Sequence, residues 1–111
     1  MSQEAPCTFC NIISGTEPAT VIHEDDEVIV IRNVLNWVPV MLLIMPKQHM
    51  TQQEMWSSPI MERIGAAAVQ AGRERCPNGY RLLSNFGHDG MQSQRHGHLH
   101  LLGGMYLGPY A

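Results

Sequence analysis

The sequence predicts an α+β domain: an antiparallel five-stranded sheet with one long helix and a short N-terminal helix. Two observations predict this class. Five short segments are rich in β-branched or other apolar residues and end in turn residues, whereas a single long segment repeats its apolar residues at helical spacing. The length of 111 residues and the hydrophobic content of 44% suit one domain with its own core. We expect residues 1–6 to be a disordered tail and residues 7–111 to form this domain.

The N-terminal half is expected to contain the short helix and three strands. CTFCNIISG is predicted to form a helix that Gly15 closes, because glycine readily adopts the left-handed C-cap conformation. TVIHE and EVIVIRN are predicted to pair as antiparallel strands around a tight turn at Asp25 and Asp26. VLNWVP breaks the pattern, and VMLLIMP is apolar enough to be a central strand.

The C-terminal half is expected to contain the long helix and two further strands. Ser58 is a candidate N-cap, and Pro59 is tolerated in the first turn because its missing N–H has no partner there. CPNG ends the helix, YRLLSN is predicted as the fourth strand, FGHDGMQSQ as a loop and HGHLHLL as the fifth strand. The apolar stripe of the helix comprises Ile60, Ile64, Ala67, Ala68 and Ala71.

Composition excludes several classes of function. A net charge of −3 disfavours general nucleic-acid binding, which requires a basic surface. The longest apolar stretch, VPVMLLIMP, is far shorter than a membrane helix, and the polar start MSQEAP lacks the features of a signal peptide. Three cysteines do not make a disulfide framework. We therefore expect a cytoplasmic domain that binds neither nucleic acid nor membranes, although a local pocket could still bind a small anion.

Three of the six histidines follow one another in strict alternation. On a strand, His96, His98 and His100 would share one face, while Leu99 and Leu101 would face the core. Each histidine alone could be an ordinary surface residue, and two at this spacing could also chelate zinc. The third interpretation is catalysis at phosphorus, in which a neutral imidazole is the nucleophile.

The residues around the histidines favour the phosphorus interpretation. Glycines at 87 and 90 would let the preceding loop bring backbone N–H groups to an anion. No Walker or dinucleotide-binding pattern is present, so a phosphate site here would be of another kind. The polar donors that crowd this region are Asn85, His88, Gln92, Ser93 and Arg95.

QSQRHGHLHLLGG resembles the signature of the histidine triad (HIT) family, in which His-φ-His-φ-His-φ-φ closes a nucleotide site. Other segments of the chain are also similar to the family, namely CTFCNIISGTEPATVIHEDDEVIVI, LLIMPKQH and RLLSN. The resemblance therefore covers nearly the whole chain. LLGG after the triad resembles the branch that cleaves nucleoside phosphoramidates. The branch that cleaves dinucleoside polyphosphates usually has Pro-Arg there.

The resemblance implies a role for each matching residue. His98 would be the nucleophile that forms a nucleotidyl-histidine, and His100 would contact phosphate. We further expect a nearby donor such as Ser93 to protonate the leaving group. Gln92, Ser93 and Asn85 would bind phosphate oxygens or the leaving amine. The residues implied to hold the base and ribose of a purine nucleotide are Phe9, Ile12, Ile31, Asn33 and Val34, although the four apolar ones could equally be core.

Two positions depart from the family pattern. Asn33 stands where an acidic residue usually binds the ribose hydroxyls, so it lacks the strength of a charge-assisted hydrogen bond. Met41 stands where relatives commonly carry a fourth histidine on the central strand. These departures bring a low-turnover nucleotide-binding protein into consideration beside the hydrolase.

The CTFC motif could be redox-active, metal-binding or incidental. A thioredoxin-like site would require a preceding strand, and only six residues precede Cys7. The family resemblance implies a structural zinc site formed by Cys7, Cys10, His49 and His96. Cys76 is expected to be a buried or idle thiol.

The leading functional hypothesis is a phosphoramidase or nucleotide hydrolase that works through His98. The alternatives are a dinucleoside polyphosphate hydrolase and the low-turnover binder. A purely structural zinc module would leave His98, His100 and the loop at Gln92 and Ser93 unexplained. The resemblance also implies a homodimer joined through the long helix and the strand at residues 80–85.

Overall fold

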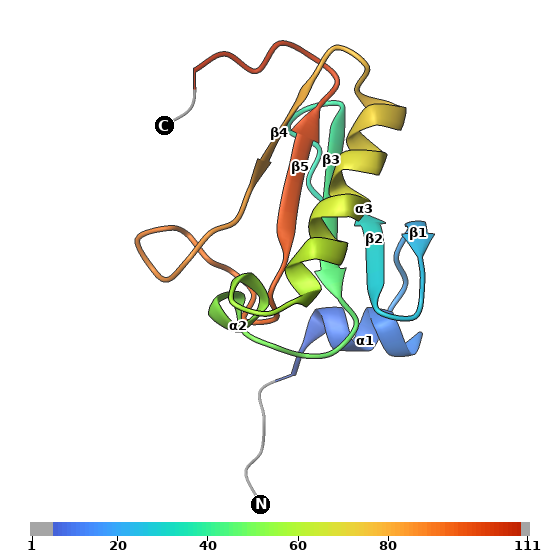
Figure 1. The fold of residues 1–111 in the computed structure, drawn as a ribbon, viewed down its shortest axis with the longest axis vertical. Helices are drawn as coiled ribbons and strands as arrows, with labels where there is room; N and C mark the ends of the chain where they lie inside the picture. Colours follow the sequence, from blue (N-terminus) through green and yellow to red (C-terminus); the bar gives the residue numbers. More distant parts are fainter. Residues whose placement is uncertain (1–5, 110–111) are drawn as a thin grey trace, which may run out of the picture.

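The computed structural model describes residues 6–109 and confirms the predicted fold class. Five antiparallel strands form one sheet in the order β1-β2-β3-β5-β4 (Figure 1). The predicted tail lies largely outside the described residues, which include only its last member, Pro6. The elements are α1 (Thr8–Ser14), β1 (Val21–Glu24), β2 (Val28–Arg32), β3 (Val40–Pro46), α2 (Gln52–Trp56), α3 (Ile60–Arg75), β4 (Tyr80–Leu83) and β5 (Leu99–Gly103).

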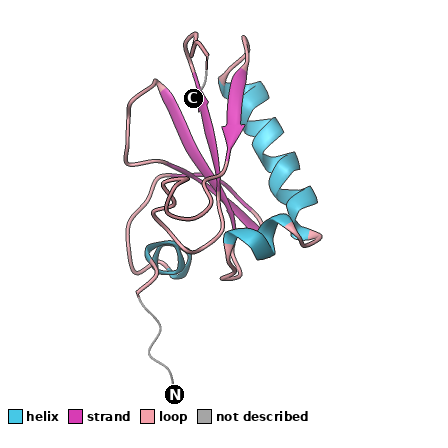
Figure 2. Cartoon of the chain, turned by 90° about the vertical axis from the view of Figure 1, so that its left-hand side faces the viewer, coloured by secondary structure: helices cyan, strands magenta, loops and turns pink. Residues whose placement is uncertain are grey.

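The two faces of the sheet have separate cores. Val28 and Val30 of β2 pack with α3 on one face, and Ile29 and Ile31 pack with Phe9 of α1 on the other. Figure 2 shows α3 along one face of the sheet. Because both faces are covered, β2 and β3 are apolar at nearly every position, which explains why the pattern at VMLLIMP indicated a central strand.

The ends of α1 and α3 differ in how well they match the sequence prediction. Gly15 closes α1 with a φ of 86°, as predicted. In α3 the N-cap is Pro59, and no side chain caps the helix, so the prediction for Ser58 was wrong. The Ser58 hydroxyl instead donates a hydrogen bond to the carbonyl of Met55 in the preceding turn.

A second short helix, α2, was not predicted. Thr51 and Glu54 form a reciprocal capping box at its start, with Thr51 Oγ1 accepting from the Glu54 N–H at 3.1 Å. With five residues, the helix is too short for its apolar residues to show a period. No described helix has the length and apolar character needed to cross a membrane.

The fifth strand begins three residues later than predicted, at Leu99. The backbone N–H of Gly97 donates to the carbonyl of Met50 at 2.7 Å, and that of His98 donates to the side chain of Gln52 at 2.8 Å. These two donors therefore bond to the segment around α2 instead of to a neighbouring strand. The fourth strand likewise ends at Leu83 rather than Asn85.

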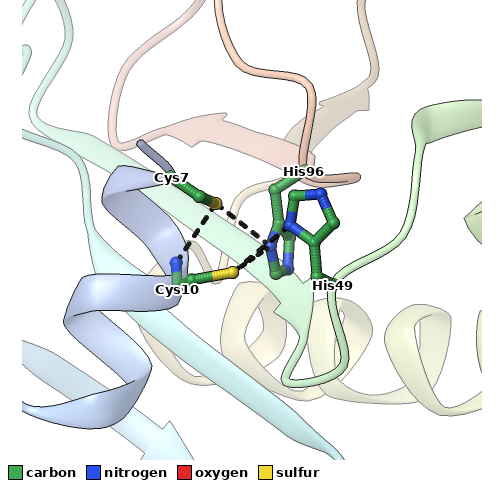
Figure 3. A group of neighbouring side chains, drawn as sticks. All are labelled: Cys7, Cys10, His49 and His96. Carbon is green, nitrogen blue, oxygen red and sulfur yellow. Dashed lines mark hydrogen bonds between the residues drawn. The ribbon is translucent and has the colours of Figure 1, made fainter. Parts of the chain in front are cut away.

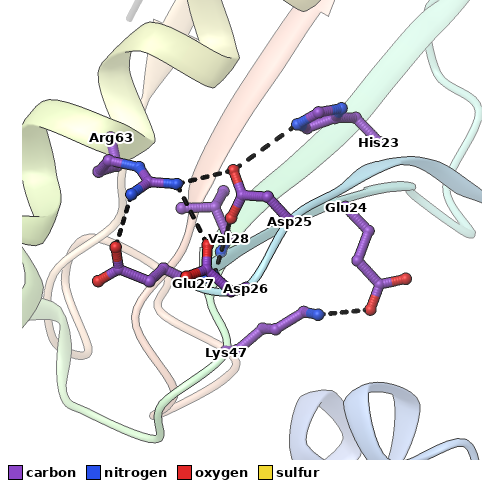
Figure 4. A network of polar contacts seen from close by, with 8 residues as sticks. All are labelled: His23, Glu24, Asp25, Asp26, Glu27, Val28, Lys47 and Arg63. Carbon is purple, nitrogen blue, oxygen red and sulfur yellow. Dashed lines mark hydrogen bonds and ion pairs between the residues drawn. The ribbon is translucent and has the colours of Figure 1, made fainter.

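The turn between β1 and β2 attaches the sheet to α3. Arg63 of α3 contacts the carboxylates of Asp25, Asp26 and Glu27, with its closest nitrogen 2.6 Å from Glu27 (Figure 4). Hydrogen bonds from the backbone N–H groups of Glu27 and Val28, aided by Arg63, lower the pKa of Asp25 to about 2. The predicted turn is thus stabilised by its own carboxylate.

Candidate functional site

The histidine segment, residues 96–100, lies between a cavity beside His98 and His100 and a cluster of cysteine and histidine side chains that includes His96. His96 and His98 are buried, and His100 is half-buried. The rings of His98 and His100 lie 5.0 Å apart, and Phe9 contacts the ring of His98 edge-on at 5.1 Å. Leu99 and Leu101 face the opposite core, against α3, as the alternation predicted.

Gly97 lets α2 pack directly on this segment. A Cβ at this position would lie 2.9 Å from Cβ of Met55 and 3.0 Å from the carbonyl oxygen of Thr51. Real Cβ atoms essentially never show the first separation, and the second is tighter than most real Cβ contacts, so α2 can pack this closely only against a glycine.

The ring of His98 is held in one tautomer. Nδ1 lies 2.8 Å from the carbonyl oxygen of His96 and donates its proton to it. Nε2 is therefore the nitrogen that carries a lone pair and remains for a substrate. Burial lowers the pKa of His98, which keeps the imidazole neutral and nucleophilic at neutral pH.

The backbone of His98 is held by two residues that the sequence analysis missed. Gln52 is fully buried, and its side chain accepts from the His98 N–H at 2.8 Å and donates to the carbonyl of Asn85 at 3.0 Å. Ser84 Oγ donates to the His98 carbonyl at 2.8 Å. The capping box at Thr51 and Glu54 was the available signal, because it places Gln52 in the first turn of a helix.

A cavity of about 650 Å³ opens beside His98 and His100. Its size suits a mononucleotide-sized ligand. Eight of the predicted catalytic and binding residues line it: Phe9, Ile12, Ile31, Asn33, Val34, Ser93, His98 and His100. Lining residues that were not predicted include Thr8, Thr20, Arg32 and Gln94.

Asn85 and Gln92, two predicted phosphate ligands, do not line this cavity. The Asn85 carbonyl accepts from Gln52. The Gln92 side chain accepts from the Gly87 N–H at 2.9 Å and donates to the Gln94 carbonyl at 2.9 Å, so it holds the loop together. In this structure both residues shape the wall of the site from outside it.

The two departures from the family pattern have local structural roles. Asn33 Oδ1 accepts from the backbone N–H of Leu35 at 3.0 Å. The sulfur of Met41 accepts from the N–H of Trp37 at 3.1 Å, and Met41 does not line the cavity. Both residues thus order the loop between β2 and β3, which borders the cavity through Asn33, Val34 and Leu35.

His100 differs from His98 in its electrostatic surroundings. Burial, with a smaller contribution from His98, lowers the pKa of His100 to about 4. His100 is therefore a neutral hydrogen-bonding group at neutral pH. Arg32, which the sequence analysis did not single out, is the positively charged residue among those that line the cavity.

At the other end of the segment, His96 faces a cluster of metal-ligating side chains. Figure 3 shows Cys7 and Cys10 from the start of α1 facing His49, which follows β3, and His96. One ligand atom from each of the four lies within 4.8 Å of the others. His96 Nδ1 is 3.6 Å from both sulfurs, and His49 Nδ1 is 3.2 Å from that of Cys10.

This geometry fits zinc. Tetrahedral coordination by sulfur and nitrogen at normal bond lengths separates neighbouring ligands by about 3.4–3.8 Å. His96 Nε2 donates to the carbonyl of Pro46 at 2.7 Å, which leaves the Nδ1 lone pair directed at the thiols. Burial lowers the pKa of His96, which favours the neutral form that binds metal.

A comparison with models of protein families identifies the family of this chain. The HIT domain model matches residues 14–106. The chain belongs to the HIT family. Its fold agrees with that of a HIT family hydrolase from Clostridium thermocellum, with a TM-score of 0.88 and 35% identity over 97% of this chain and 98% of the other.

Two further HIT relatives concern zinc. The 14 kDa zinc-binding protein of Zea mays is 36% identical over 94% of this chain and 86% of its own length. A zinc-bound histidine triad family protein from Mycobacterium smegmatis superimposes with a TM-score of 0.72 and 30% identity, covering 92% of this chain and 76% of that protein. Together with the Cys₂His₂ geometry, they support the predicted zinc set.

A third HIT relative concerns the reaction. The protein named adenylylsulfatase HINT1 from Arabidopsis thaliana is 35% identical over 94% of this chain and 75% of its own length. The chain therefore resembles HIT proteins described as hydrolases, in agreement with the leading hypothesis at the level of reaction class.

Proposed function

We propose that this protein is a nucleotide hydrolase that cleaves the bond between the α-phosphorus of a purine nucleotide and its leaving group, with phosphoramidates as the preferred substrates. The observation that carries the proposal is the state of His98. Its Nδ1 is engaged by the His96 carbonyl, and the ring lines a cavity of about 650 Å³, so Nε2 is available for attack.

The proposed reaction has two steps. Nε2 of His98 attacks the α-phosphorus, the P–N bond breaks, and the departing amine takes a proton, with Ser93 as its donor. Water then attacks the phosphorus of the nucleotidyl-histidine: its oxygen bonds to phosphorus as the bond to Nε2 breaks, and the proton that it loses returns to Ser93. This step releases the nucleoside monophosphate and restores the neutral imidazole. One water is consumed, and the products are a nucleotide and an amine.

Different residues of the cavity lining would bind different parts of the nucleotide. We propose that Phe9, Ile12, Ile31 and Val34 hold the purine and that Asn33 contacts the ribose. Arg32, Ser93 and His100 lie in the same lining and would bind phosphate oxygens, where opposite charge and hydrogen-bond donors stabilise the transition state. Asn85 and Gln92 would contribute by holding the loop that carries Ser93.

Zinc would be held by Cys7, Cys10, His49 and His96. Because all four positions are protein ligands, the site is closed and its role is structural. It would connect the start of α1, the end of β3 and the segment that leads to His98. In the proposed reaction the nucleophile and the proton donor are His98 and Ser93, which lie outside this set of metal ligands.

The deciding experiment is a substrate panel with trapping of the intermediate. Purified protein is incubated with adenosine phosphoramidate, guanosine phosphoramidate and diadenosine polyphosphate, then quenched in mild base and analysed by mass spectrometry. We expect phosphoramidate turnover and a nucleotidyl adduct on the peptide containing His98. Faster cleavage of the polyphosphate would select the alternative substrate class. Tight binding of all three nucleotides without product would select the low-turnover binder.

We also propose that the protein is a homodimer joined through α3 and β4. β4 pairs with β5 on one side only and is therefore an edge strand, which proteins usually cover or pair. Light scattering at micromolar concentration should give twice the chain mass of 12.4 kDa. A monomer under these conditions would refute this assembly.

A further inference from the structure

A second hollow of about 410 Å³ adjoins the nucleotide cavity. It lies between the start of α2, at Thr51 and Gln53, and the loop between β4 and β5. Ser93 and Gln94 line both spaces and so form the wall between them. A ligand larger than a nucleotide could therefore extend from the cavity past Ser93 into this hollow.

The residues around the hollow have a distinct chemical character. Every side chain that lines it is polar or cationic, and none carries a carboxylate. Asp89, which pairs with His88 at 3.1 Å, is not among the lining residues. Arg95 is exposed and makes no hydrogen bond or ion pair with the residues that the structure describes. Its guanidinium is therefore available to a ligand.

We propose that this hollow receives the leaving group of the substrate and that Arg95 selects leaving groups that carry an anionic substituent. The proposal rests on the proposed function of His98. In displacement at phosphorus, the nucleophile and the leaving group lie on opposite sides of the reacting atom. A nucleoside that fills the cavity beside His98 leaves the far side of the Ser93 wall for the departing amine.

The side chains of this region suit such a role. Arg95 presents a planar guanidinium that can bind a carboxylate through two parallel hydrogen bonds. Gln53 and Thr51 can supply uncharged hydrogen-bonding groups from the opposite side of the hollow. The anionic substituent is unchanged in the reaction: the P–N bond breaks, the amine gains its proton, and the carboxylate leaves with the amine.

The test compares two substrates that differ in a single group. Adenosine phosphoramidates of β-alanine and of β-alaninamide have the same length and differ in whether the end is a carboxylate or a neutral amide. For the unmodified protein we expect kcat/KM to favour the β-alanine substrate by about three- to tenfold, because an exposed charge contact is partly screened by water. The preference should fall as salt is raised.

Arg95→Gln should bring this ratio close to one. The matched control is Arg73→Gln, which removes the same charge from an exposed position near the end of α3. Because α3 belongs to the proposed dimer interface, light scattering first verifies that this variant has the mass of the unmodified protein, and it should then keep the same ratio. A ratio near one in the unmodified protein, or a preference that survives Arg95→Gln, would overturn the inference. Failure to hydrolyse either substrate would instead overturn the proposed function on which it rests.

A binding measurement separates recognition from turnover. The inactive variant His98→Asn should bind the β-alanine substrate more tightly than the β-alaninamide substrate by isothermal titration calorimetry. Adding Arg95→Gln should weaken only the former, by about the same three- to tenfold. Equal weakening of both substrates would mean that Arg95 shapes the loop without selecting charge, and would contradict the proposal.

Discussion

His96 and His98 stand two residues apart, are both buried and both contact the ring of Phe9, yet they present opposite nitrogens. His96 donates from Nε2 to the Pro46 carbonyl and keeps the lone pair on Nδ1. His98 donates from Nδ1 to the His96 carbonyl and keeps the lone pair on Nε2. In each histidine, the hydrogen bond to a backbone carbonyl thus fixes the tautomer.

The groups that face the nitrogen with the lone pair then determine what that nitrogen can bind. Nδ1 of His96 faces two cysteine sulfurs, which suits a soft divalent cation. His98 faces a cavity whose lining includes Arg32, His100 and Ser93, which suits a phosphate. The comparison teaches that one short segment carries two sites because the elements packed on its two ends differ.

Removing the proposed nucleophile should produce the largest effect. His98→Asn should reduce phosphoramidate turnover by about three or more orders of magnitude, because covalent catalysis is lost with its nucleophile. Nucleotide binding should remain, since the cavity and its phosphate donors remain. Steady-state kinetics and calorimetry measure the two properties separately. If His98→Asn turns over normally while His100→Asn is inactive, the nucleophile has been assigned to the wrong histidine.

Removing the metal tests the zinc site that includes His96. Elemental analysis of protein purified without chelators should find about one zinc per chain, as expected of one four-ligand site. Chelation should lower the free energy of unfolding by about 4 kcal/mol relative to protein in zinc a thousandfold above its dissociation constant. Cys7→Ser should lose the metal, and Cys76→Ala, which changes a cysteine outside the cluster, should retain it. Protein that contains no metal as purified would eliminate the site.

Gln52 tests whether the backbone of His98 must be held in place. Gln52→Leu removes both side-chain hydrogen bonds and leaves the His98 N–H and the Asn85 carbonyl without them. The expected cost is about 2–3 kcal/mol in the free energy of unfolding, measured with urea. Gln53→Leu is the control, because Gln53 is an exposed neighbour and should change stability by less than about 0.5 kcal/mol. Similar losses for both variants would contradict a specific role for Gln52.

The smallest expected effect concerns the protonation of His100. Its pKa is lowered to about 4 in the folded protein, so between that value and about 6.5 the unfolded chain binds more protons. Stability should therefore be complete above about pH 6.5, fall as the pH drops toward 4, and level off below it. Screening at a half-buried group reduces the contribution to about 1–2 kcal/mol. NMR titration of the imidazole should give the low midpoint, and His100→Asn should remove this part of the pH dependence. A midpoint near 6.5 would contradict the assignment.

The sequence pattern was sufficient to predict those features of the fold that depend on neighbouring residues. The β-branched run at residues 27–33 and the apolar run at residues 40–46 predicted β2 and β3 within one residue at each end. Gly15 marked the end of α1 because an L-residue with a side chain rarely adopts its φ of 86°. The alternation of His98 and Leu99 predicted that Leu99 faces the core against α3, since successive side chains of an extended chain point to opposite faces.

Contacts between distant residues could be seen only in the folded chain. The α2 helix is too short to show a period. The hydrogen bond between the Gln52 side chain and the backbone of His98, which lies 46 residues away, therefore could not be predicted. Asn85 and Gln92 are suitable phosphate donors by residue type, but their backbone or side-chain groups are used within the loop and around α2. Arg32 and Gln94 were given no role from the sequence, and they reach the cavity because β2 and the β4–β5 loop converge there.

By itself, the sequence determined the fold class, which follows from hydrophobic periodicity, a property of neighbouring residues. The resemblance of its motifs to the HIT family singled out the histidines and cysteines, and only the structure showed that both faces of the sheet are covered. Tertiary structure alone decided which nitrogen of each histidine is available, which polar groups face the cavity, and that Arg95 borders a second hollow. The physical reason is that hydrogen bonds and cavities are formed between elements, so their partners are set by packing rather than by position along the chain.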